Sequence, residues 1–304
     1  MGSNGHRPIK RRLDLPGLLR GHRQVAFVLS GGGSLGAAQV GMMQALFDAG
    51  IKPDLLVGSS VGAVNAAWIG AWPAKQGVEK LAEIWTGLRR DDVFPLGWTA
   101  AMGLLGRGKH LISNAALRGV LERHLPYERL EQAQIPVHVV TTELRSGRAV
   151  VLSSGPSVPA LLASCAIPGV FPPVTIGRRE LVDGGVANHT PIATAVELGA
   201  RIIYVLPIGY PWLHEEPANA LGMALQALAR LVEQRLESEI ASYRDVVDIR
   251  VVPAIEPLAV SPADFTRTQE LIERGRASAE RLVQSYSRGK LETAKLRRAP
   301  AHAA

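Results

Sequence analysis

The chain has 304 residues, of which 47% are hydrophobic and 20% are charged, so it can bury a sizeable core and is not expected to be disordered. Its net charge of +7 sits at the ends: residues 1–25 carry six basic and one acidic side chain, and residues 288–304 carry five and one. The body is therefore nearly neutral. Basic ends of this kind suit weak attraction to anionic lipid as well as they suit nucleic-acid phosphates, with ordinary solvated tails as the alternative; we expect no nucleic-acid partner.

Short apolar runs alternate with longer helical patterns, which predicts an α/β protein: a three-layer α/β/α sandwich with a mainly parallel central sheet. The predicted strands are 24–29, 54–57, 136–142, 149–152, 202–206 and 246–252. The predicted helices are 35–49, 63–71, 75–88, a helix from Ser113 or Asn114 to Leu125, 218–243 and 263–286. We expect one domain at residues 24–287, between a basic, flexible segment at 1–23 and a basic, disordered tail at 288–304.

A G-x-S-x-G pattern, GSSVG at residues 58–62, stands between the second predicted strand and the helix that follows it. A serine at a sharp strand-to-helix turn is exposed as a nucleophile, and Gly58 and Gly62 remove side chains that would clash there. Ser60 would also lie at a helix N-terminus, where N–H groups stabilise negative charge. We expect Ser60 to be a nucleophile; the alternative is a serine that caps the helix.

A second glycine-rich segment, SGGGSLG at residues 30–36, follows the first predicted strand. It matches the dinucleotide pattern G-x-G-x-x-G, but the acidic residue at the required spacing, Asp54, begins the second strand instead of ending it. Alternatively, consecutive glycine N–H groups form an oxyanion hole for a tetrahedral intermediate. The candidate donors are Gly31, Gly32 and Gly33, and Gly36 completes the motif. We favour the oxyanion hole over a nucleotide loop or a plain turn.

A serine nucleophile needs a base, and Asp183 is the first candidate. It follows an apolar pair and precedes Gly184 and Gly185, a placement that presents a carboxylate at the edge of a sheet. By itself, Asp-Gly-Gly is typical of a turn. In the Ser, Asp, His chain order of α/β-hydrolases, His189 or His214 would complete a triad with Asp183. The residues alone do not decide between a Ser-Asp dyad and a triad that includes one of these histidines.

Together the three segments resemble the patatin-like phospholipase family. The segment at 30–36 is similar to the family's glycine-rich oxyanion loop, that at 58–62 to its nucleophile elbow, and DGG at 183–185 to its Asp-Gly-Gly or Asp-Gly-Ala motif. Two further segments are similar to family sequence, ASCAIPGVFPPV and VANHTP. The resemblance covers residues 24–208.

The resemblance implies a Ser-Asp dyad without a catalytic histidine, on a three-layer α/β/α fold. Asp183 would accept the proton of Ser60 as it attacks a lipid ester, and would later activate the water that frees the acyl-enzyme. The implied function is a phospholipase or lysophospholipase type of acyl hydrolase with no cofactor and no metal. His189 and His214 then become structural.

Three other functions remain compatible with the residues. An acyltransferase would use the same serine and pass the acyl group to an alcohol or thiol. A non-catalytic lipid-binding protein would keep the fold without the reaction, although Ser60, Asp183 and the glycine loop together argue against it. A nucleotide-binding Rossmann protein would need the acidic residue that the second strand does not supply at its end.

A single cysteine, Cys165, excludes an internal disulfide and is expected to be a small core residue. The basic N-terminal segment has no apolar run typical of a signal peptide, and nothing in the sequence is long and apolar enough to span a membrane. We therefore expect a cytoplasmic protein whose membrane contact, if any, is peripheral.

Residues 94–111 are apolar yet rich in glycine, which makes them a candidate flap. Four of their side chains suit either core filling or an apolar mouth for acyl chains: Trp98, Met102, Leu104 and Leu105. Arg107, Lys109 and the pair Arg178-Arg179 are candidate contacts for a lipid phosphate, with ordinary solvated charges as the alternative.

Overall fold

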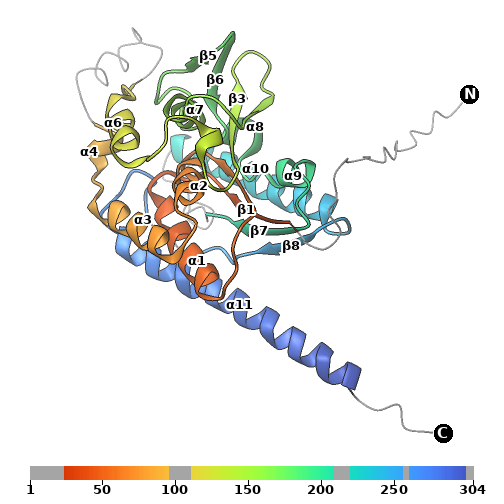
Figure 1. The fold of residues 1–304 in the computed structure, drawn as a ribbon. Coiled ribbons are helices and arrows are strands. Elements are labelled where there is room, and N and C mark those ends of the chain that lie inside the picture. Colours follow the sequence, from red (N-terminus) through yellow and green to blue (C-terminus); the bar gives the residue numbers. More distant parts are fainter. Residues whose placement is uncertain (1–23, 96–110, 209–219, 256–259, 299–304) are drawn as a thin grey trace, which may run out of the picture.

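A computed structural model of the chain describes residues 24–95, 111–208, 220–255 and 260–298. Within them, eight strands form one sheet in the order β5-β6-β3-β2-β1-β7-β8, with β4 also paired to β3 (Figure 1). The strands are β1 (Val25–Leu29), β2 (Leu55–Ser59), β3 (Val137–Glu143), β4 (Ala149–Leu152), β5 (Val174–Ile176), β6 (Arg179–Asp183), β7 (Ile202–Leu206) and β8 (Asp248–Val251). Five of them, β3, β2, β1, β7 and β8, are parallel, as predicted for the centre of the sheet.

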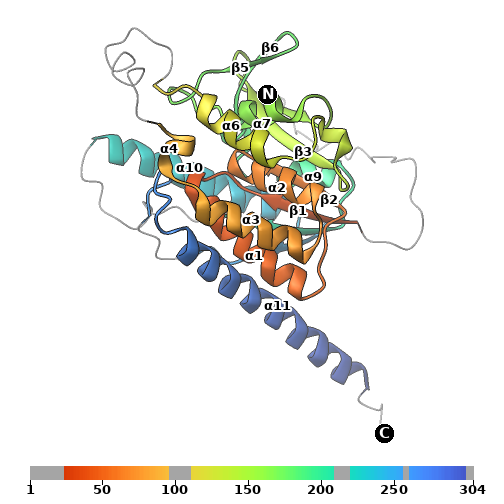
Figure 2. The same cartoon turned by 60° about the vertical axis from the view of Figure 1, so that its left-hand side comes forward.

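Helices cover both faces of the sheet, which confirms the three-layer prediction (Figures 1 and 2). They are α1 (Ala37–Asp48), α2 (Val61–Ala71), α3 (Lys75–Gly87), α4 (Arg90–Val93), α6 (Ala115–His124), α7 (Ser157–Ser164), α8 (Gly185–Asn188), α9 (Ile192–Glu197), α10 (Ala220–Tyr243) and α11 (Thr268–Arg298). The short 3-10 helices are η1 (Gly33–Gly36) and η2 (Leu130–Gln132). Figure 2 shows α11 lying along α1.

Strand β1 is buried on both faces, so its sequence is continuously apolar instead of alternating. Phe27 packs with the core under α1, α2 and α3, whereas its neighbour Val28 packs with the core under α9 and α10. Successive side chains of a strand point to opposite faces, so one strand supplies both cores.

The sequence patterns located most of the long elements but not the antiparallel end of the sheet. Strands β5 and β6 were not predicted, nor were the short helices α4, α7, α8 and α9. Helix α11 runs from Thr268 to Arg298 and contains most of the helix predicted at 263–286. Residues 96–110 of the flap candidate at 94–111, and His214, lie outside the described residues. None of the described helices is long and apolar enough to cross a membrane.

The antiparallel end of the sheet brings two distant segments together. Strand β2 pairs in parallel with the first half of β3 and ends with Ser59 opposite Val140. Strand β6 pairs antiparallel with the second half of β3 and ends with Asp183 opposite Thr141. Because β4 pairs with the middle of β3, it must occupy the other edge of that strand. Strands β2 and β6 therefore run toward each other along one edge of β3, and their carboxyl ends meet.

Candidate active site

Ser60 lies at the junction of β2 and α2 in a strained backbone conformation. Its φ is 53° and its ψ is −130°, and among the described residues no other non-glycine residue has a positive φ. A Cβ on Gly58 would lie 2.4 Å from the carbonyl oxygen of Gly62, and one on Gly62 would lie 2.3 Å from that of Leu29. Side chains at 58 and 62 would force the turn apart, as the sequence analysis expected. Strain of this kind, about 1–3 kcal/mol, persists only when the surroundings hold it.

Buried hydrogen bonds hold the turn in place. The N–H of Ser60 donates to Oγ of Ser164 at 2.8 Å, and the Ser164 hydroxyl donates to the carbonyl oxygen of Val140 at 2.6 Å. The end of β6 is held in the same way, because the hydroxyl of Thr142, on β3, donates to the carbonyl oxygen of Asp183 at 2.8 Å. Ser164 and Thr142 thus link the two meeting strand ends through β3, and no local sequence motif marks either residue.

Where the carboxyl ends of β2 and β6 meet, the hydroxyl of Ser60 contacts the carboxylate of Asp183. The hydroxyl of Ser60 donates to Oδ2 of Asp183 at 2.6 Å, and the N–H of Gly185 donates to Oδ1 at 2.7 Å. Ser60 is 7% exposed and Asp183 is 6% exposed. Burial raises the pKa of Asp183 to about 6, although the hydrogen bonds from Ser60 and Gly185 oppose that rise. A carboxylate with a pKa close to neutrality can act as a general base.

His189 borders the same site. A Cβ built on Gly31 would lie 3.1 Å from Nε2 of His189 and 3.1 Å from Cβ of Ser60, so these three residues are neighbours. Burial lowers the pKa of His189 to about 4. Asp183 is therefore the stronger base of the two, and it accepts the hydrogen bond from Ser60 that a triad would give to a histidine.

The glycine-rich loop joins β1 to α1 beside Ser60. Gly32 and Gly33 have φ values of 151° and 61°, which favour glycine. Just beyond them, the N–H of Ser34 donates to the carbonyl oxygen of Pro262 at 2.7 Å. In the part of the chain that the structure describes, the N–H groups of Gly31, Gly32 and Gly33 donate no hydrogen bond. These three groups can therefore bind an oxyanion without breaking an existing bond.

Two fully buried amide side chains connect both ends of this loop to the helix that follows the nucleophile. Gln39, on α1, donates from Nε2 to the carbonyl oxygen of Ser30 at 2.9 Å. Asn65, on α2, donates from Nδ2 to the carbonyl oxygen of Gly36 at 3.0 Å and to Oε1 of Gln39 at 2.9 Å. Oδ1 of Asn65 accepts from the indole N–H of Trp85 at 2.9 Å. This amide network fixes the loop relative to α2.

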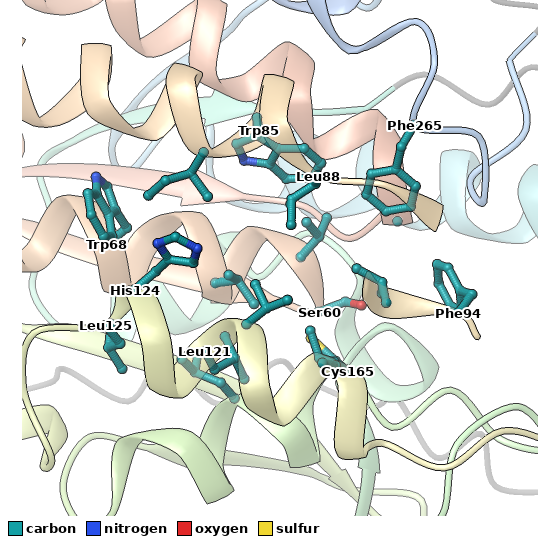
Figure 3. A pocket seen from close by; sticks show the side chains of 18 of the residues that line it. Ser60, Trp68, Trp85, Leu88, Phe94, Leu121, His124, Leu125, Cys165 and Phe265 are labelled. Atoms are coloured by element: carbon teal, nitrogen blue, oxygen red, sulfur yellow. The ribbon is translucent and has the colours of Figure 1, made fainter. Parts of the chain in front are cut away.

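An apolar cavity of about 100 Å³ extends from Ser60 along α2 (Figure 3). Val61, Val64 and Trp68 line it, at the spacing that places residues on one helix face. The opposite walls come from α3, α6, α7 and the loops around them, with Leu81, Trp85, Leu117, Leu121, Phe171 and Phe265 among the lining residues. In Figure 3, Trp68, His124 and Leu125 lie toward one end of the cavity, and Ser60 lies toward the other end, with Phe94 and Phe265 beyond it. Such a narrow apolar space beside a nucleophile suits an acyl chain.

The remaining predicted site residues have structural places. A Cβ on Gly184 would lie 2.2 Å from the carbonyl oxygen of Val140, so this glycine permits the close approach of β6 to β3. Cys165 is buried as expected, and it also lines the cavity beside Ser60; burial raises the pKa of its thiol. Among the described residues, no three His, Cys, Asp or Glu side chains gather in a way that could hold a metal ion.

Comparison with known sequences places residues 27–196 in the family model described as patatin-like phospholipase. A patatin-like phospholipase domain-containing protein of Caenorhabditis elegans is 26% identical over 278 residues, which cover 83% of this chain and 20% of that protein. An uncharacterized NTE family protein of Mycobacterium tuberculosis (strain ATCC 25618 / H37Rv) is 32% identical over 181 residues, covering 59% and 47%. The lysophospholipase NTE1 of Mycosarcoma maydis is 26% identical over 194 residues, covering 61% and 10%. The chain thus spans less than half the length of these relatives.

Two solved structures are similar at low identity. VipD from Legionella pneumophila matches with a TM-score of 0.46 and 16% identity, over 86% of this chain and 67% of that chain. Human GIVD cytosolic phospholipase A2 in complex with methyl gamma-linolenyl fluorophosphonate matches with a TM-score of 0.47 and 13% identity, over 89% and 58%.

Proposed function

This chain belongs to the patatin-like phospholipase family, and on that premise we propose that it is a serine lipid acyl hydrolase with Ser60 as nucleophile and Asp183 as base. The observation that carries the proposal is the 2.6 Å hydrogen bond from Ser60 to a carboxylate whose pKa burial raises to about 6. The substrate class is a carboxylic ester of a lipid, such as a phospholipid or lysophospholipid.

In the acylation step, Oγ of Ser60 attacks the ester carbonyl carbon and its proton moves to Oδ2 of Asp183. The carbonyl oxygen becomes an oxyanion, which N–H groups of Gly31, Gly32 and Gly33 bind, and each such donor contributes about 10²–10³-fold to kcat in related chemistry. Collapse of this intermediate breaks the bond to the alcohol, which takes the proton back from Asp183. The acyl group remains on Ser60.

In the deacylation step, Asp183 accepts a proton from water as the water attacks the acyl-enzyme carbonyl. The same N–H groups bind the second oxyanion. Breaking of the acyl bond returns the proton from Asp183 to Oγ of Ser60 and releases the fatty acid. One carboxylate thus serves both steps, and its raised pKa suits it to take and return a proton near neutral pH.

The cavity supports a lipid substrate over a small polar ester. It follows α2 from Ser60 to Trp68, eight residues or roughly 12 Å at 1.5 Å per residue. Its volume of about 100 Å³ limits how much of the chain it can enclose, because an engineered apolar cavity of about 150 Å³ holds a single benzene ring. We therefore expect the cavity to enclose only the first few acyl carbons alongside α2.

The proposal is tested by hydrolysis of a p-nitrophenyl ester and a lysophospholipid by wild type, Ser60→Ala and Asp183→Asn. We expect both variants to lose at least about 10³-fold in kcat while keeping the wild-type circular dichroism spectrum. Ser59→Ala is the matched control, because the buried hydroxyl of Ser59 has no hydrogen-bond partner among the described residues. Full activity in Ser60→Ala would refute the proposal, and an ester product formed with an added alcohol would indicate acyl transfer.

A further inference from the structure

Two neighbouring β-hairpins project beyond the sheet edge at which Ser60 lies (Figure 1). One turns between β3 and β4 through residues 144–148, and the other turns between β5 and β6 through residues 177–178. Ser60 follows the β2 residue that pairs with Val140. The tips of both hairpins lie about six residues further along the direction of β3, so they extend past Ser60 by roughly 15–20 Å.

The turns of these hairpins carry an excess of cations. Four exposed arginines lie there: Arg145, Arg148, Arg178 and Arg179. Two glutamates accompany them, Glu143 and Glu180, and Nε of Arg179 lies 3.8 Å from Oε1 of Glu143. Among the described residues, the other three arginines form no ion pair. We call residues 143–149 and 176–180 the basic hairpin surface.

Exposed apolar side chains lie beside these turns, on the face of the sheet opposite to Glu143 and Arg179. Leu144 and Val151 share a face with Thr142, because directly paired residues and every second residue of a strand point the same way. Helix α8 lies on that face too, since the N–H of Ala187 donates to Oγ1 of Thr142 at 3.0 Å. Leu144 is 48% exposed, Val151 37% and Val186, on α8, 55%. Val186 is three residues from Asp183, so the apolar face adjoins the active site.

We propose that the basic hairpin surface, with Leu144 and Val186, docks on an anionic lipid bilayer and so presents membrane lipid to Ser60. This proposal rests on the proposed function, because a water-soluble substrate would need no such surface. Arginines near an anionic membrane each strengthen binding about fivefold. Apolar side chains beside the cations favour a lipid interface over a nucleic acid, whose contacts are mainly with phosphates.

Vesicle binding by the full chain tests the surface. Arg145→Gln combined with Arg178→Gln is expected to bind phosphatidylcholine vesicles that contain phosphatidylserine at least about tenfold more weakly than wild type. The Lys double variant at the same positions keeps the charge and should keep the binding. The matched control is Arg201→Gln combined with Arg244→Gln, because these exposed arginines lie before β7 and after α10, at the opposite edge of the sheet.

A fluorescent label locates the contact directly. Cys165 is the only cysteine and is buried, so a polarity-sensitive thiol dye will react with a cysteine introduced on the surface. We expect the dye on Leu144→Cys to shift to the blue when anionic vesicles are added. The dye on Val246→Cys should not shift, because Val246 is 60% exposed but lies at the opposite edge of the sheet. Labelled wild type gives the background from Cys165.

The outcomes separate this proposal from the proposed function. Wild-type binding by the Gln double variant, or an equal blue shift at both label positions, would overturn the docking surface. Weaker binding to a DNA oligonucleotide in the same variant, without any shift at Leu144→Cys on vesicles, would assign the surface to another polyanion and would also overturn it. Hydrolysis of a water-soluble ester is measured separately: its absence in wild type refutes the enzyme, while its presence in the double variant shows that the active site is intact.

Discussion

The two halves of the site meet at Ser60 but are held by different forces. On the dyad side, strand ends, a strained turn and buried hydrogen bonds fix Ser60 and Asp183. On the cavity side, the lining is made almost entirely of apolar side chains such as Val64 and Leu121. The volume and shape of the cavity, not hydrogen bonds, therefore determine what it can bind. The dyad should therefore respond to the loss of single atoms, whereas the cavity should respond to volume and should change chain-length preference before it changes the chemistry.

We expect the largest effect from adding one methyl group at Gly62, in the turn that holds Ser60. Its Cβ would lie 2.3 Å from the carbonyl oxygen of Leu29, so Gly62→Ala must displace β1 and the glycine loop. We expect a loss of at least about 3 kcal/mol in the free energy of unfolding, measured by urea denaturation, or failure to fold. Gly119→Ala is the control, because a Cβ there meets nothing within 4 Å and lies inside helix α6; it should stabilise the protein by about 0.5–1 kcal/mol. Equal stability of the two variants would contradict the tight turn.

A second test measures how the buried carboxylate of Asp183 makes the free energy of unfolding depend on pH. Because the folded-state pKa of Asp183, about 6, lies above its unfolded value of about 3.8, the folded protein binds more protons between these values. Stability should therefore decrease as pH rises from 4 to 6, by about 3 kcal/mol for this group at 1.36 kcal/mol per pKa unit. Asp183→Asn removes the charge, so it should be more stable than wild type at pH 8 and lose that advantage below pH 4. Chemical denaturation at both pH values measures the difference, and an Asn variant less stable at pH 8 would show that the charge is well stabilised.

Removal of the Ser164 hydroxyl tests whether its hydrogen bonds hold Ser60 in position. Ser164→Ala leaves the N–H of Ser60 and the carbonyl oxygen of Val140 without their buried partners, at a cost of about 2 kcal/mol. We expect kcat to fall about 10–100-fold while KM changes little, because the turn and not the cavity is altered. Ser157→Ala, on the same helix, removes one partly buried hydrogen bond to the carbonyl oxygen of Tyr127 and should keep wild-type kcat. Equal kcat and KM values in the two variants would show that Ser164 does not hold Ser60 in position.

The cavity side should show the smallest effect, and only with long substrates. Val64→Phe fills the space beside α2, so kcat/KM for a dodecanoyl ester should fall about tenfold while that for a butyryl ester stays near wild type. Val246→Phe, at an exposed position away from the cavity, provides the control. If both chain lengths lose activity equally, the acyl chain does not lie along α2.

Local motifs point to the proposed reactive residues, but not to the residues that support them. GSSVG and DGG point to Ser60 and Asp183 because glycine at a tight turn leaves a mark in the sequence, and the structure brings the two side chains within 2.6 Å. Ser164 could not be found this way, since its role depends on β2 and β6 meeting on β3, which no local pattern encodes. Gln39 and Asn65 did leave a signal: each is a polar residue inside an apolar helix, and a buried amide must find partners.

The missed elements have a similar cause. Strands β5 and β6 are short and lie at the edge of the sheet, with exposed residues from Gly177 to Glu180, so they lack the continuous apolar pattern of β1 and β2. Helix α7 contains Pro159 and spans only Ser157–Ser164, too short for a clear helical period. The parallel centre of the sheet was predictable because burial on both faces demands apolar residues throughout.

The central claim is that Asp183, and not a histidine, is the base for Ser60. The pH dependence of kcat/KM for a short-chain ester tests it most directly in wild type and His189→Gln. Our account predicts that activity in both falls about tenfold per pH unit below pH 6, where Asp183 becomes protonated, and that Asp183→Asn is inactive at every pH. Loss of activity in His189→Gln, with residual activity in Asp183→Asn or no inflection near pH 6 in wild type, would contradict the dyad and favour a triad.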